Sequence, residues 1–125
     1  MNVMAVLKKF IPFLKNSEAI LIHFCSCLEN LLDLDSGKEL FKEEKIALKL
    51  YEKLDSEFIL SLDDYAEDFF NVLSLINDIP MSKYYLFQTE FLVKLIQVLE
   101  MNANNLDLSR HISLFIVSLL VKGIF

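Results

Sequence analysis

The chain has 125 residues, of which 54% are hydrophobic and 24% are charged, and its formal net charge is −6. This length is typical of one domain, and the apolar content excludes a disordered chain. The acidic balance argues against direct binding to nucleic acid, because nucleic-acid-binding proteins need a basic surface.

Apolar residues recur with helical periodicity through nearly the whole chain. Strands are not expected, because glycine and threonine are rare and the dipeptides that mark hairpins do not occur. We therefore predict an all-α fold in which residues 1–125 form a single compact bundle of five to six helices, with a largely buried C-terminal helix.

The first two helices are predicted over residues 3–11 and 17–33. Pro12 ends the first helix, because proline disfavours the helical state at the residue before it. Ser17 precedes the second helix and is a favourable N-cap.

The third helix is predicted from Ser36, which forms a capping box with Glu39, to Leu54. Five lysines share one side of this helix, opposite an apolar side. This lysine stripe consists of Lys38, Lys42, Lys45, Lys49 and Lys53. It indicates a solvated face, or a surface complementary to the acidic helix of a second copy. Residues 55–60 are ambiguous between a short helix and a continuation of the third.

The fourth helix is predicted from Ser61 to the residue before Pro80, with one apolar and one polar side. Residues 54–82 contain seven acids and no lysine or arginine. These acids, which we call the acidic face, are Asp55, Glu57, Asp63, Asp64, Glu67, Asp68 and Asp78. A surface of one charge sign attracts a basic protein and accelerates its association.

Two other interpretations of the acidic face stay open. It can be a solvated face that keeps a hydrophobic protein soluble. It can also be a cation site at Asp63, Asp64, Glu67 and Asp68, although no EF-hand pattern is present. The absence of lysine and arginine supports binding of a basic partner, because a merely solvated face usually mixes both charge signs. A cation site is less expected, because calcium and magnesium ligands usually come from a loop that wraps the ion.

The fifth helix is predicted from Ser82 to about Met101 and the sixth from Asp107 to Lys122. The sixth helix is apolar nearly all round, and we expect it at the centre of the bundle. The alternative is that residues 83–125 form the interface of a homodimer.

Arg110, the only arginine, falls in the first turn of the sixth helix, where the helix dipole disfavours a cation. We predict an ion pair with Asp107, and Arg110 is also a candidate binding hot spot.

Metal and catalytic sites are not predicted. Cys25 and Cys27 point to opposite sides of a helix, so they cannot share one ion. His23 and Cys27 lie one helical turn apart and could, but two more ligands would have to come from elsewhere. Asp107 and His111 lie one helical turn apart and are interpreted as a cap and a surface residue. No nucleophile with a base and no phosphate-binding glycine loop is present. We therefore predict a protein that is not an enzyme and has no metal and no cofactor.

The longest apolar runs are shorter than the roughly 20 residues that cross a bilayer. No signal-peptide pattern is present, and two cysteines one residue apart do not make a disulfide framework. We therefore predict a cytoplasmic protein without a membrane span.

The leading functional hypothesis is a small acidic inhibitor of the immunity or antitoxin type. It would mask a basic protein partner through the acidic face. One alternative is a structural subunit of a homo-oligomer or multiprotein complex, with the apolar C-terminal helices as interface. A second is a viral or phage antagonist of a host protein.

Overall fold

The structure, a computed structural model, describes residues 3–79, 82–101 and 104–121. Within these ranges it contains nine α-helices, three 3₁₀ helices and no strand. The predicted all-α class is confirmed. The predicted number of five to six helices is wrong, because two of the predicted long helices are each divided in two and residues 55–60 contain a separate short helix.

The N-terminal segments follow the prediction closely. Helix α1 spans Val3–Phe10 and leads directly into the 3₁₀ helix η1, Ile11–Asn16, which has a proline in its first turn. Helix α2 spans Glu18–Leu31. Ser17 is its N-cap, as predicted, and the Ser17 hydroxyl oxygen accepts a hydrogen bond of 3.4 Å from the Ile20 backbone N–H.

The helix predicted over residues 36–54 is two helices, α3 (Asp35–Glu43) and α4 (Ile46–Lys53). They are separated at Lys45, whose backbone is left-handed with φ of 53°. A left-handed residue interrupts a right-handed helix, so α4 starts in a new direction. The predicted lysine stripe is therefore divided between two helices, and Leu34, not Ser36, occupies the N-cap position of α3.

Residues 55–60, ambiguous in sequence, contain the short helix α5 (Ser56–Leu60). Asp55 caps this helix, because its Oδ1 accepts a hydrogen bond of 2.8 Å from the Phe58 backbone N–H. A 3₁₀ turn, η2 (Asp63–Tyr65), then leads into α6 (Ala66–Asn77). The fourth predicted helix therefore begins later than its sequence pattern indicated.

The fifth predicted helix is divided into η3 (Ser82–Tyr84), α7 (Tyr85–Gln88) and α8 (Phe91–Met101). The sixth is α9 (Leu106–Val121). Its cap is Asn105 instead of Asp107, because the Asn105 Oδ1 accepts a hydrogen bond of 3.2 Å from the Leu108 backbone N–H. The predicted end at Lys122 lies outside the described residues.

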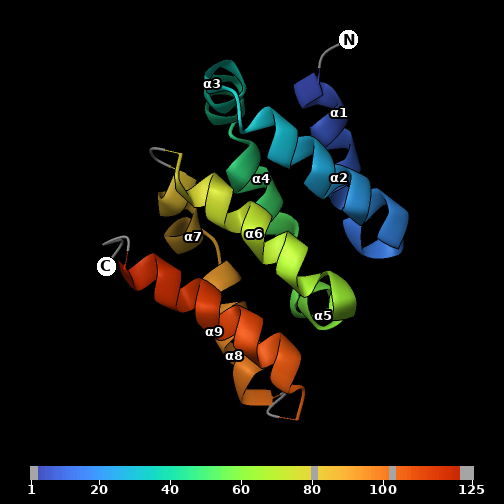
Figure 1. The fold of residues 1–125 in the computed structure, drawn as a ribbon, viewed down its shortest axis with the longest axis vertical. Coiled ribbons are helices and arrows are strands. Elements are labelled where there is room, and N and C mark those ends of the chain that lie inside the picture. The colour runs from blue at the N-terminus through green and yellow to red at the C-terminus, as the bar shows by residue number, and fades with distance from the viewer. Residues whose placement is uncertain (1–2, 80–81, 102–103, 122–125) are drawn as a thin grey trace.

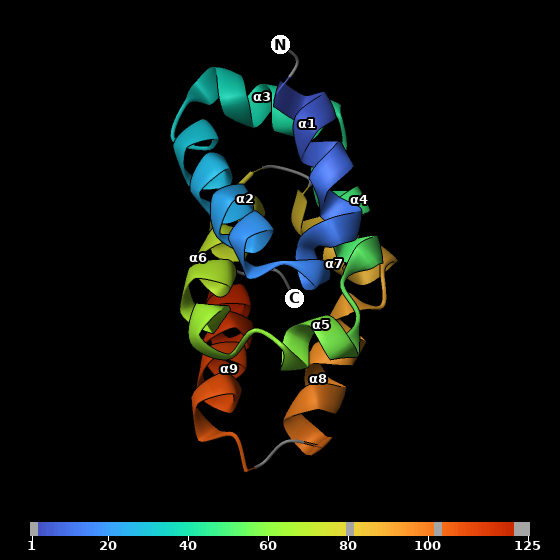
Figure 2. The same cartoon turned by 90° about the vertical axis from the view of Figure 1, so that its right-hand side faces the viewer.

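Helix α6 is the central element of the fold. It contacts α2 on one side and α9 on the other. Figures 1 and 2 show these three helices in succession along the molecule, and Figure 2 shows α4, α5 and α8 on the opposite side. The buried apolar side chains form one cluster to which α1, α2, α4, α6, α8 and α9 all contribute.

One polar contact lies inside this core. The Tyr51 hydroxyl of α4, which is fully buried, donates a hydrogen bond of 3.0 Å to the Asn77 Oδ1 of α6. Burial raises the pKa of Tyr51, so this phenol is neutral and can donate. The bond fixes the relative position of α4 and α6, because an unpaired polar atom at this depth is costly.

The C-terminal helix is not largely buried in the chain described here, so this part of the prediction is not confirmed. Helix α9 buries a single stripe made of Leu108, Ile112, Phe115 and Leu119. Its outer side exposes half or more of Leu114, Val117, Leu120 and Val121. No described helix is long and apolar enough to cross a membrane; α9, with 16 residues, is about 24 Å long, against a hydrocarbon core of about 30 Å.

Candidate functional site

The structure separates the seven acids of the predicted acidic face into three groups. Asp55 and Glu57 lie at the start of α5, whereas Asp64 lies in η2 and Glu67 and Asp68 lie in the first turn of α6. Asp78 lies at the opposite end of α6. The backbone places Asp63 in η2, while its side chain lies outside the described part of the structure.

The α5 group is largely occupied within the chain. Lys15 of η1 lies 3.2 Å from the Asp55 Oδ2 and 3.9 Å from the Glu57 Oε2. The backbone N–H of Phe58 and, to a smaller extent, Lys15 hold the pKa of Asp55 below its usual value. Asp55 therefore has a structural role as a cap and an ion-pair partner, and this end of the predicted acidic face is partly neutralised.

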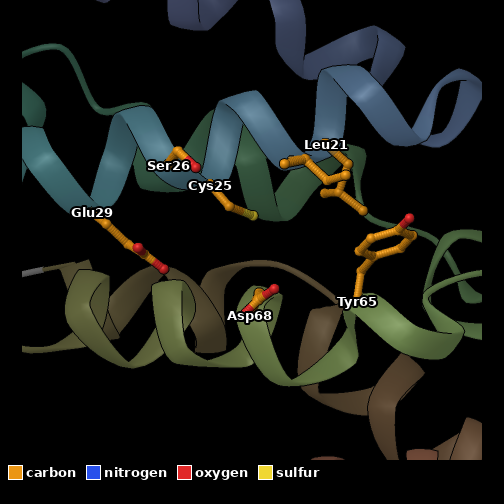
Figure 3. Close-up of a pocket in the computed structure, with 7 residues that line it drawn as sticks. Leu21, Cys25, Ser26, Glu29, Tyr65 and Asp68 are labelled. Carbon is orange, nitrogen blue, oxygen red and sulfur yellow. The ribbon is translucent and has the colours of Figure 1, made fainter.

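Of the acids around the start of α6, Asp68 lines a cleft that was not predicted from the sequence. The cleft lies between α2 and α6, has a volume of about 250 Å³, and opens to solvent. Figure 3 shows the Cys25 and Glu29 side chains of α2 extending toward α6. Its lining residues are Leu21, Ile22, Cys25, Ser26 and Glu29 from α2, with Tyr65 and Asp68 beside them.

The lining combines an apolar floor with acidic edges. Leu21 and Cys25 are 5% exposed and form the floor, whereas the Glu29 and Asp68 carboxylates are exposed. At one end of the cleft, the Tyr65 hydroxyl donates a hydrogen bond of 3.3 Å to the Glu18 Oε2 of α2. None of the lining residues is basic, and neither α2 nor α6 contains a lysine or an arginine.

The acids around the cleft contribute to raised pKa values of two of its residues. Burial, aided by the charges of Glu29 and Asp68, raises the pKa of the Cys25 thiol to about 12. The charge of Glu18 is the main cause of a raised pKa at Tyr65, and Asp64 adds to it. Both groups therefore stay protonated at neutral pH, and Cys25 is a poor nucleophile. The cleft is suited to holding a cation, not to attacking a substrate.

Sequence reasoning missed the contribution of α2. The predicted acidic face included only acids from residues 54–82, but residues 16–37 also lack lysine and arginine. That second stretch contains Glu18 and Glu29, which the tertiary structure brings to the same cleft as Asp68. The absence of lysine and arginine marks both stretches in the sequence, but it does not indicate that α2 and α6 pack against each other.

The other predicted residues do not form a site in the described structure. Arg110 is exposed, and no ion pair joins it to Asp107 among the described side chains. Instead, the Asp107 Oδ1 lies 3.9 Å from the Nε2 of His111, so the expected Arg110 ion pair is absent there. No group of three or more His, Cys, Asp or Glu side chains in the described ranges is arranged to hold a metal ion.

A second cleft, of about 300 Å³, lies between η1 and the α4–α5 turn. Its charged lining mixes both signs, with Lys15 and Lys53 beside Glu52 and Asp55. Because its charges compensate one another, it offers no preference for a ligand of either sign.

A search of protein-family models, curated proteins and solved structures finds no significant match to this chain.

Proposed function

We propose that this protein is a non-enzymatic binding protein that docks a basic protein partner on the surface formed by α2 and the start of α6. The observation that carries the proposal is that α2 and α6, which both lack lysine and arginine, meet at an acidic cleft with an apolar floor. An inhibitor of the immunity or antitoxin type is the biological role that best suits such a surface, because masking a basic protein requires charge complementarity and no chemistry.

The distribution of charges across the cleft supports this proposal. Glu29 and Asp68 lie on facing helices and both line the cleft, so a cation between α2 and α6 would meet acids from both sides. Glu67 and Asp68 lie in the first turn of α6, where the helix dipole stabilises negative side chains. The dipole of α6 does not account for Glu29 on α2. A basic partner would complement the acids on both helices when it binds.

The proposal is tested by titrating the protein with fluorescein-labelled octalysine and following fluorescence anisotropy at low and moderate salt. The cleft variant carries Glu29→Gln, Asp64→Asn, Glu67→Gln and Asp68→Asn. We expect it to bind the peptide about tenfold more weakly and with a flatter salt dependence, because it lacks the charges that attract and hold the peptide.

The matched control carries Glu39→Gln, Glu43→Gln, Glu90→Gln and Glu100→Gln, all at exposed positions outside the cleft. It loses the same four negative charges and is expected to keep its affinity within about twofold. Equal weakening in both variants would show that only net charge matters and would contradict the proposal. Thermal melts of both variants verify that each is folded.

A second candidate function is a subunit that assembles through α9, and the exposed apolar side of α9 is the observation that favours it. On the leading proposal we expect a monomer in gel filtration with light scattering, at low and at high salt. A salt-resistant dimer that Val117→Glu dissociates would support the second candidate instead, because a charge on that side opposes apolar contact. Glu39→Gln, far from α9, is the control.

A further inference from the structure

We propose that the cleft between α2 and α6 holds a single arginine side chain of the basic partner. This inference rests on the proposed function and specifies how the partner is anchored. The volume of about 250 Å³ is smaller than the roughly 300–1,000 Å³ of pockets that enclose a whole small molecule. A cleft of this size is therefore suited to one inserted side chain.

The apolar residues of the cleft match the stem of a long basic side chain. Leu21 and Cys25 form the buried floor, and the exposed Ile22 adds apolar surface on the α2 side. The methylene groups of arginine or lysine pack on such apolar surface while the charged end stays in a polar environment. A short polar ligand or a hydrated ion would gain nothing from these contacts.

The acidic residues match the charged end. Figure 3 shows the Glu29 carboxylate extending from α2 toward α6 and the Asp68 carboxylate extending from α6 toward α2. Glu29 and Asp68 both line the cleft together with Cys25, so a cation bound in the cleft would have carboxylates on both helices beside it. A planar guanidinium has donors on several edges and can bond both acids at once, whereas an ammonium acts as a point charge.

Tyr65 closes one end of the cleft and favours the same ligand. Its ring lines the cleft, and its hydroxyl is held by Glu18. An aromatic ring that is fixed in this way can stack on a guanidinium, and arginine makes such contacts more often than lysine. Arginine therefore satisfies the apolar wall, the two acids and the ring together.

The probe for this inference is N-acetyl-arginine methylamide, titrated into the ¹⁵N-labelled protein and followed in ¹H–¹⁵N correlation spectra. We expect saturable shifts concentrated at Cys25, Ser26, Tyr65 and Asp68. The citrulline analogue, which has the same shape without the charge, is expected to bind at least about tenfold more weakly. The lysine analogue is expected to bind less tightly than arginine. Equal binding of arginine and either analogue, or shifts spread over all exposed acids, would overturn the inference.

Two variants separate this inference from the proposed function. Ser26→Phe, at an exposed position in the cleft, fills the cleft without changing charge. It is expected to abolish the arginine-specific shifts while octalysine affinity stays within about twofold, because the surface charges are intact. Asp68→Asn is expected to weaken the arginine probe about fivefold or more, and Glu39→Gln to leave it unchanged.

The two proposals then fail in different ways. Normal octalysine binding with no response to the arginine probe would overturn the arginine anchor and leave the docking surface intact. Cleft-specific binding of the arginine probe, with octalysine affinity unaffected by the cleft variant, would instead contradict the proposed docking surface.

Discussion

Replacing Phe91 with alanine is expected to lower the free energy of unfolding by about 4 kcal/mol. Phe91 is the first residue of α8 and is fully buried. Its ring stacks on that of Tyr51 at a centroid distance of 5.1 Å and an interplanar angle of 29°. The substitution removes both the apolar contact and the stacking, and it leaves a cavity beside the hydrogen bond between Tyr51 and Asn77.

Urea denaturation followed by circular dichroism and by tyrosine fluorescence measures this effect. Val93→Ala is the control, because Val93 lies on α8 but is 55% exposed, and its loss is expected to change stability by less than about 0.5 kcal/mol. Coincident transitions are expected for both probes, since one cluster joins the buried residues. A Phe91→Ala loss similar to that of the control, or two separate transitions, would contradict the expectation of one cooperative domain.

Replacing Gly37 with alanine is expected to destabilise the protein by about 2–3 kcal/mol. Gly37 lies in α3, where helix propensity alone would favour alanine by about 1 kcal/mol. However, a Cβ at this position would overlap the carbonyl oxygen of Leu31 at the end of α2. It would also lie 2.9 Å from the Leu31 carbonyl carbon, and backbone atoms cannot move aside as a flexible side chain can.

The matched control is Ser36→Ala in the same helix, where the side chain is exposed. This change is expected to be neutral or slightly stabilising, because alanine is the better helix former. Thermal and urea unfolding of both variants decide the sign. An increase in stability for Gly37→Ala would show that α2 and α3 do not approach each other as closely as the structure places them.

Local features were predicted from sequence where they depend on residues within one helical turn. Ser17 is the clearest example, since its cap forms with Ile20, three residues later. Predictions failed where a local pattern continued through a break. The periodic run across Lys45 gave no sign of the left-handed residue that separates α3 from α4. Similarly, Asn105 caps α9 although Asp107 is an equally acceptable capping residue by type.

The candidate site was also predicted only where its residues lie close together in the sequence. An acidic surface was predicted from residues 54–82, and the structure places Asp64 in η2 directly before Glu67 and Asp68 in the first turn of α6. The sequence could not separate these residues from Asp55, because only the fold brings Lys15 to it from 40 positions earlier. It also could not assign Glu29 to the site, since Glu29 reaches the cleft through the packing of α2 on α6.

By itself the sequence determined that the chain is helical, which sides of its helices are apolar, and that residues 54–82 lack lysine and arginine. These properties follow from the 3.6-residue period and from composition, both of which are local. Only the tertiary structure decided that α2 and α6, which lack lysine and arginine, face each other across a cleft. It also decided that the outer side of α9 is exposed. Those outcomes depend on which helices pack together, and packing joins residues too far apart in the chain for any local pattern to specify.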